Sequence, residues 1–157
     1  QAEAELPYGG IGFLGLRLGM SREQALAAAD ASDLLLAPPR RDVEFFPVEN
    51  RRILTLSVQP EVPFIYLQFF DDVLYAITVI FDDAHIDYYI LARSLEQRYG
   101  SWDRLQPDSR LWRVGEVTIR VEKPAVVKYI ALEDFLEAAG FPAERPAGRE
   151  ERLLEGL

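Results

Sequence analysis

The residues best suited to metal or acid–base chemistry surround the only histidine of the chain. His85 follows Asp82 and Asp83 and precedes Asp87. An imidazole among carboxylates can bind a divalent cation or exchange protons near neutral pH. The spacing does not fit an EF-hand calcium loop, and aspartates just before a helix commonly cap it and interact with its dipole. We therefore expect a helix-capping loop, and we predict no metal site and no cofactor.

Other catalytic signatures are weak. The sequence contains no cysteine, which excludes thiolate catalysis within it, and no Gly-x-Ser-x-Gly motif. The glycine-rich residues 8–19 lack the Lys-Ser/Thr ending of a phosphate-binding loop, so we expect an irregular or extended lead-in. Trp102 and Trp112 could stack on a ligand, but aromatic residues near strand ends usually belong to the core or its rim. The 26 acidic residues offer many carboxylate pairs for glycoside hydrolysis. Nothing selects one pair, so we predict no catalytic residue.

The segment 63–81 is the centre around which the other elements are expected to pack. Two apolar runs rich in aromatic and β-branched residues flank Asp71-Asp72, a pattern that predicts a β-hairpin with a two-residue turn. Unbroken alternation would place Phe70 opposite Val73, Phe69 opposite Leu74, Gln68 opposite Tyr75, Leu67 opposite Ala76 and Tyr66 opposite Ile77. One face would then hold Tyr66, Phe70, Val73, Tyr75, Ile77 and Val79, and the other Ile65, Leu67, Phe69, Leu74 and Ile80.

Neither face of this hairpin is polar, so each needs a cover. The chain's own helices can cover one face, and the other would need the C-terminal tail, a second copy of the chain or a different protein. Aromatic bulk mixed with polar groups is typical of interface cores, and four residues share this character: Tyr66, Gln68, Phe70 and Tyr75. We predict that they form the face for a partner or for self-association, and that Tyr75→Glu weakens association without unfolding the monomer.

The remaining elements alternate between helices and strands. Ser21 and Gln24 form a predicted capping box for a helix that ends near Ala31. Strands are expected at 43–48, 53–59 and 126–132, together with a hairpin in which Trp112, Val114, Val117, Ile119 and Val121 share one face. A second helix carries the apolar stripe Tyr88, Leu91, Ala92, Leu95 and Tyr99 and ends at Gly100, and a third spans 133–139. We predict one α+β domain over 1–157, with helices packed on an antiparallel meander sheet, pseudo-repeat halves at 11–81 and 84–139, and a tail at 142–157.

The charge and hydropathy of the chain argue against two classes of function, nucleic-acid binding and membrane spanning. A net charge of -9 without a basic run argues against nucleic acid as a partner. No apolar run reaches the roughly 20 residues of a membrane-spanning helix. The first residue is Gln1 rather than methionine, which fits cleavage of an export signal and equally fits a trimmed sequence; a lipid anchor would lie upstream of Gln1.

The segment Gly19-Met20-Ser21-Arg22-Glu23-Gln24 resembles the opening of the BamE/SmpA family of small outer-membrane lipoproteins. In that family a Gly-Met-Ser/Thr step begins a helix with an acidic-Gln pair, and an antiparallel meander follows. The broader superfamily includes the β-lactamase inhibitor protein, which has two helix-plus-sheet units in tandem. The resemblance implies a non-enzymatic, extracytoplasmic envelope protein, periplasmic or associated with the outer membrane, that binds another protein through a sheet face. A small-molecule or lipid-binding module and a carboxylate-based hydrolase remain the alternatives.

Overall fold

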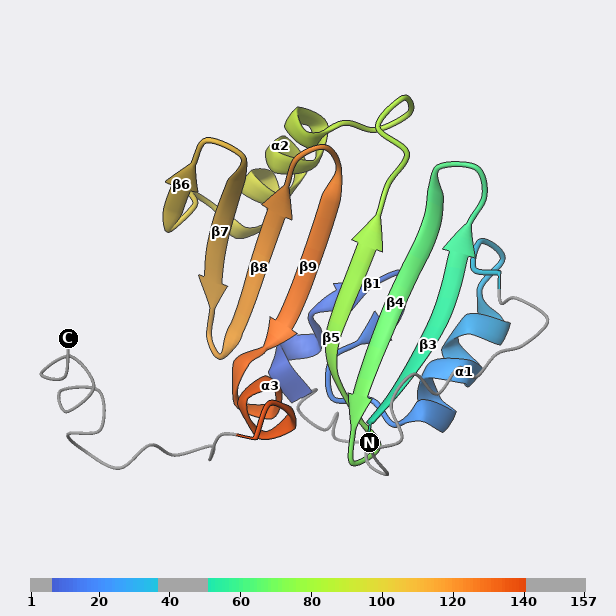
Figure 1. The fold of residues 1–157 in the computed structure, drawn as a ribbon. Helices are drawn as coiled ribbons and strands as arrows, with labels where there is room; N and C mark the ends of the chain where they lie inside the picture. The colour runs from blue at the N-terminus through green and yellow to red at the C-terminus, as the bar shows by residue number, and fades with distance from the viewer. Residues whose placement is uncertain (1–6, 37–50, 141–157) are drawn as a thin grey trace, which may run out of the picture.

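A single seven-stranded antiparallel sheet dominates the fold (Figure 1). The computed structural model describes residues 7–36 and 51–140, and it confirms the predicted α+β class. The strand order across the sheet is β3-β4-β5-β9-β8-β7-β6. The strands are β3 (Arg51–Val58), β4 (Val62–Phe70), β5 (Val73–Ile80), β6 (Arg104–Gln106), β7 (Ser109–Val114), β8 (Val117–Glu122) and β9 (Val126–Ala131). The predicted halves meet where β5 pairs with β9 at the centre of the sheet.

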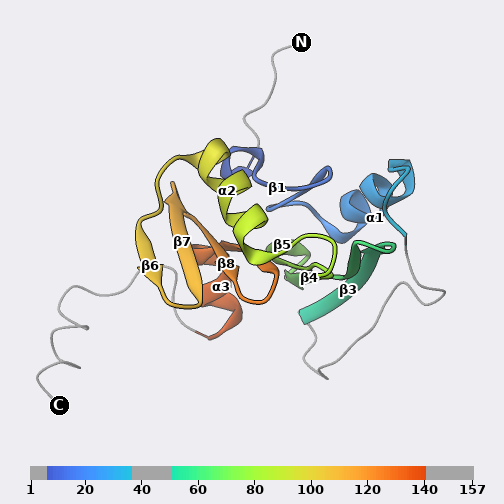
Figure 2. The ribbon, with the colours of Figure 1, turned by 90° about the horizontal axis from the view of Figure 1, so that it is seen from above.

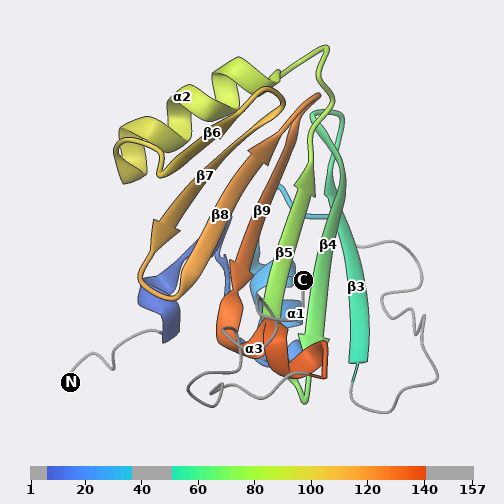
Figure 3. The ribbon, with the colours of Figure 1, turned by 60° about the vertical axis from the view of Figure 1, so that its left-hand side comes forward.

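The two faces of the sheet are covered differently (Figures 2 and 3). The inner face carries the helices α1 (Arg22–Ala31) and α2 (Tyr88–Tyr99). The 3-10 turn η1 (Pro7–Gly10) and the small hairpin of β1 (Gly12–Phe13) and β2 (Leu16–Arg17) lie on the same side and precede α1 in the chain. The opposite face is called the outer face. Among the described elements, only the short helix α3 (Leu132–Ala138) reaches it, at one end of β5 and β9.

The core lies between the inner face and these covering elements. Its fully buried strand residues are apolar, and they include Leu54, Leu56, Ile65, Leu67, Phe69, Ile77, Val79, Trp112, Ile119 and Val121. Trp112 can be buried at little polar cost because its indole Nε1 donates a hydrogen bond to the Gly100 carbonyl at 2.8 Å. This bond pairs the one polar atom of a buried tryptophan, so burial retains the full hydrophobic gain of the ring.

The predicted start of the first helix is confirmed. Ser21 is the N-cap of α1, with the Gln24 amide donating to Ser21 Oγ at 3.1 Å and the Ser21 amide donating to Gln24 Oε1 at 2.9 Å. The Arg22 amide donates to Asp72 Oδ1 at 2.9 Å. These contacts satisfy amides at the helix start that have no partner within the helix. The last one also ties α1 to the turn of the central hairpin.

The turn of the central hairpin is also confirmed. Asp71 and Asp72 both adopt positive φ, at 52° and 61°, as a two-residue type I′ turn requires. Aspartate tolerates this conformation better than most residues because its side chain bonds locally. Phe70 pairs with Val73 as predicted.

Phe69 pairs with Leu74, again as predicted, but beyond this pair the predicted register is wrong by one residue. The pairing shifts between Gln68 and Phe69, so Gln68 lies opposite Ala76 rather than Tyr75, and Leu67 opposite Ile77. Tyr75 is the extra residue of a β-bulge. Because side chains alternate with a period of two, one inserted residue moves all later residues of the strand to the other face.

The bulge therefore changes the residue content of both faces. Ile77 and Val79, which alternation places with Tyr66, are instead fully buried on the inner face. Thr78 and Ile80 take their places on the outer face, where they pair with Tyr66 and Phe64.

The second half follows the predicted pattern more closely. Asp87 caps α2 by accepting from the Ile90 amide at 3.0 Å, and Gly100 ends the helix at a φ of 87°. The hairpin of β7 and β8 turns at Gly115-Glu116, with the predicted apolar side chains on the inner face. Strand β6 lies in the polar segment between α2 and β7, for which the sequence predicts no strand. The predicted strand at 43–48 and the tail at 142–157 lie outside the described residues.

Candidate functional site

The four predicted partner-face residues divide into two environments. Tyr66, Gln68 and Phe70 lie on the outer face of β4 and are half-buried. Tyr75 lies in the bulge, where its ring centroid is 6.2 Å from that of Phe135 in α3. Tyr75 is therefore half-buried in β5, at the end of the outer face that α3 covers. The other three residues lie along β4.

Aromatic and aliphatic side chains form a patch on this part of the outer face. The rings of Phe64 and Tyr66 stack, with centroids 5.8 Å apart and an angle of 5° between their planes. Phe64 is 46% exposed, a large fraction for a phenylalanine in a long strand. Together with Ile80, which pairs with Phe64, these residues are called the aromatic patch. Its exposed apolar surface has the character of a contact surface.

A basic strip lies beside the aromatic patch on the same face. It consists of Arg104 in β6, Arg113 in β7, Arg120 in β8 and Lys128 in β9. Glu122 lies between its two half-buried members, with Lys128 Nζ 3.2 Å from Glu122 Oε1 and Arg120 Nη1 3.4 Å from Glu122 Oε2. Among the strand residues whose side chains are described, Glu122 is the only carboxylate on the outer face.

Strand register places the strip and the patch in continuous rows. One row across the sheet runs through Arg104, Leu111, Arg120, Lys128, Thr78, Tyr66 and Thr55. Neighbouring strands are about 4.8 Å apart, so Lys128 and Tyr66 are separated by about 10 Å and Arg104 and Tyr66 by about 24 Å. A single extended or helical segment of a partner could therefore contact both regions.

The loop around His85 is a capping loop. His85 Nδ1 is 3.4 Å from Asp82 Oδ2, and both side chains are largely exposed. Asp82 Oδ1 accepts from the Ala84 amide at 3.0 Å, while Asp87 caps α2. Within residues 7–36 and 51–140, no group of three or more potential metal ligands converges.

Trp102 participates in a cation–π cluster on the inner side. The Arg110 guanidinium lies 4.5 Å from the Trp102 ring centroid and 5.6 Å from that of Tyr88. Lys123 Nζ lies 5.4 Å from the Tyr88 ring. The cations of the chain itself thus stack on the Trp102 and Tyr88 rings.

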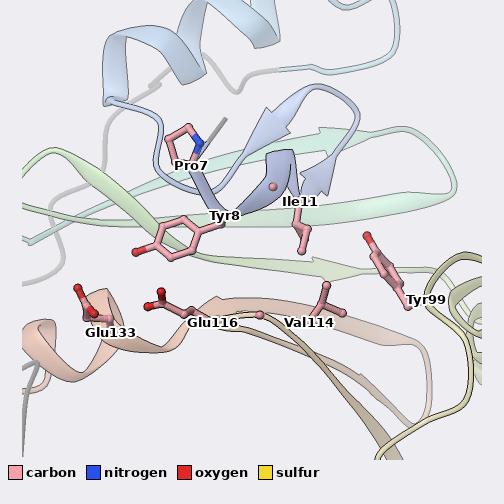
Figure 4. A pocket seen from close by; sticks show the side chains of 9 residues that line it. Pro7, Tyr8, Ile11, Tyr99, Val114, Glu116 and Glu133 are labelled. Atoms are coloured by element: carbon pink, nitrogen blue, oxygen red, sulfur yellow. The ribbon is translucent and has the colours of Figure 1, made fainter. Parts of the chain in front are cut away.

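A groove lies between the N-terminal turn η1 and the sheet (Figure 4). It has a volume of about 720 Å³, which is large enough for a small organic molecule. Figure 4 shows Tyr8, Glu116 and Glu133 toward one end, and Ile11, Val114 and Tyr99 toward the other. One end is thus acidic and the other apolar.

Tyr8 joins η1 to α3 at the acidic end of the groove. Its hydroxyl donates to Asp134 Oδ2 at 2.5 Å, and its backbone has a positive φ of 54°. Burial, the hydrogen bond to Asp134 and the nearby charges of Glu133 and Glu116 raise the pKa of Tyr8 well above its ordinary value of 10. The phenol therefore stays protonated and keeps donating this bond.

Sequence reasoning does not find the groove. Tyr8 and Asp134 are 126 residues apart. Glu116 occupies a hairpin turn and Glu133 lies in the first turn of a short helix, two places where acidic residues are common for local reasons. Only the tertiary fold brings these residues together, and no sequence motif predicts that they form a groove.

Comparison with protein families identifies the chain. The profile of the TP0088 domain matches residues 11–140, which is most of the chain, so the chain belongs to the TP0088 domain family. Neither curated proteins nor solved structures give a match. In the part of the chain that the structure covers, no helix is long and apolar enough to cross a membrane.

Proposed function

We propose that this TP0088 domain protein is a non-enzymatic envelope protein that binds another protein through the outer face of its sheet. The observation that carries the proposal is the aromatic patch. Phe64, Tyr66 and Ile80 lie on long strands of the sheet, away from α3. Half-exposed aromatic side chains on a rigid sheet offer contact area at a low cost in conformational entropy.

The proposed location outside the cytoplasm depends on the resemblance to the BamE/SmpA family. Two features support that resemblance. The capping box at Ser21 and Gln24 begins a helix that leads into an antiparallel meander. The two meanders β3–β5 and β6–β9 also meet at the central pair of β5 and β9, an arrangement expected of two tandem helix-plus-sheet units. Fractionation of source cells would test the location.

A matched pair of substitutions tests the binding face. Phe64 on the outer face and Tyr89 on α2 are both exposed aromatic residues, at 46% and 56%. Immobilised chain is used to capture proteins from an envelope extract, and Phe64→Glu is compared with Tyr89→Glu. We expect a specific captured protein to be lost with Phe64→Glu and retained with Tyr89→Glu. Equal capture by both variants would rule out the outer face as the binding surface.

The groove favours small-molecule binding as a second candidate function. Its apolar end, formed by Ile11, Val114 and Tyr99, could hold the body of a ligand. Glu116 and Glu133 are exposed to solvent at the other end, whereas carboxylate catalysis takes place in a site that excludes water. The groove therefore supports ligand binding better than the carboxylate-based hydrolase. A ligand-dependent rise in melting temperature that is lost in Val114→Glu would establish this role.

A further inference from the structure

We infer that the partner of the outer face presents a segment that is acidic at one end and apolar at the other, with its carboxylates on the basic strip and its apolar side chains on the aromatic patch. This inference rests on the proposed function, because it specifies the chemistry of the protein that binds the same face.

The strands of the outer face carry a charge opposite to that of the whole chain, whereas α3, at one end of β5 and β9, adds Glu133, Asp134 and Glu137. The whole sequence carries a net charge of -9. The described strand positions of the outer face nevertheless carry four cations, Arg104, Arg113, Arg120 and Lys128, and one carboxylate, Glu122. A random patch of an acidic protein is expected to be acidic. A locally positive strip on a negative molecule attracts an acidic partner to that place, while the rest of the surface repels it.

The side chains of the basic strip are accessible to a partner. Arg104 and Arg113 are exposed, and the side chains of Arg120 and Lys128 are 41% and 36% exposed. Arg120 and Lys128 share Glu122, so the single carboxylate does not neutralise both. Arginine also presents a planar fork of donors that can bind a carboxylate with two hydrogen bonds.

The aromatic patch provides the other half of the recognition. The middle row passes from Arg120 and Lys128 through Thr78 to Tyr66 without interruption. Between Thr55 and Thr78 this row holds no charged side chain. An acidic segment alone would leave the Phe64 and Tyr66 rings in water. A segment that continues into apolar residues would bury them as well.

A second copy of the chain is a poorer occupant of this face. A symmetric dimer through the outer face would present each basic strip with an identical surface. The strand positions of that surface contribute one described carboxylate, Glu122, which already pairs with two cations of its own chain. The carboxylates of α3 lie at one end of β5 and β9, where Asp134 already accepts a hydrogen bond from the Tyr8 hydroxyl. The charge complementarity therefore points to a different protein.

A peptide titration followed by NMR tests this chemistry. The probe is a ten-residue peptide with four glutamates in its first half and leucine, tyrosine and valine in its second. The control peptide has the same sequence with glutamine in place of every glutamate. We expect the acidic peptide to shift amide signals of β4, β5, β8 and β9, to bind about tenfold more tightly than the glutamine peptide, and to weaken as salt is raised.

Charge-matched variants show whether the basic strip is responsible. Arg120→Gln/Lys128→Gln removes two cations from the strip, and Arg17→Gln/Arg93→Gln removes two exposed cations from elsewhere. The first double variant is expected to weaken binding of the acidic peptide about tenfold, and the second to leave it nearly unchanged. Equal effects of both variants, or equal binding of the two peptides, would overturn the inference. Tighter binding of a uridine oligonucleotide to the same residues would overturn it too, because the partner would then be a nucleic acid.

Failure of this inference is distinguishable from failure of the proposed function. If capture from envelope extract depends on Phe64 but not on Arg120, Lys128 or salt, the outer face binds a protein whose recognition is apolar, and only the acidic chemistry is wrong. If capture depends on none of these residues, the outer face is not the binding surface and both proposals fail.

Discussion

The β-bulge at Tyr75 predicts that alanine substitutions at two isoleucines of the same strand differ in their cost in stability. Ile77 is fully buried on the inner face, whereas Ile80 is half-buried on the outer face beside Phe64. Unbroken alternation from the Asp71-Asp72 turn would reverse the two positions. Substituting each with alanine removes the same atoms, so the difference between the variants reports which face each side chain occupies.

The expected magnitudes are well separated. Ile77→Ala leaves a cavity among packed core side chains and is expected to cost about 2–5 kcal/mol of unfolding free energy. For a chain of this size, that corresponds to a fall in melting temperature of roughly 5–15 °C. Ile80→Ala removes partly solvated atoms and is expected to cost about 1 kcal/mol or less. Guanidinium titrations followed by circular dichroism measure both, provided that the m-values agree with that of the unmodified chain. A larger cost for Ile80→Ala would show that the bulge is misplaced.

Three further outcomes follow from the described contacts. Ser21→Ala removes the capping box of α1 and is expected to lower stability by about 1 kcal/mol in a denaturant titration; no change would contradict the observed helix start. Burial and the neighbouring Tyr99 raise the pKa of Tyr129 from 10 to about 12, so the folded state keeps a proton that the unfolded state loses. Stability should therefore fall as pH rises from 10 to 12, and Tyr129→Phe should reduce that slope in unfolding curves measured across this range. Trp112→Phe removes the donor to the Gly100 carbonyl and part of a buried ring, and calorimetry should show a loss of at least about 1 kcal/mol.

The sequence was sufficient for elements whose determinants are local. The capping box at Ser21, the turn at Asp71-Asp72 and the end of α2 at Gly100 each depend on a few adjacent residues with specific backbone or capping roles. The faces of β7 and β8 were also predictable because their alternation is unbroken.

What the sequence did not predict depends on tertiary contacts. Nothing in the run from Val73 to Ile80 distinguishes Tyr75 as a bulged residue, because every neighbour is apolar or fits either face. The structure places Tyr75 against Phe135, a contact between residues 60 positions apart. The short strand β6 has little periodicity of its own and forms through pairing with β7. Alternation alone places Arg113 and Arg120 on one face of their hairpin, where they look like part of an ordinary solvated sheet face. The extension of the strip to Arg104 and Lys128 becomes visible only when the order of the strands in the sheet is known.

The claim that the outer face binds a protein partner is tested most directly by site-specific photo-crosslinking in source cells. A photo-reactive phenylalanine analogue replaces Tyr66 on the outer face or, as the control, Tyr89 on α2. We expect position 66 to give a discrete adduct that contains a second, different protein, and position 89 to give none. An adduct of the chain with itself alone, or the same adducts from both positions, would contradict the account.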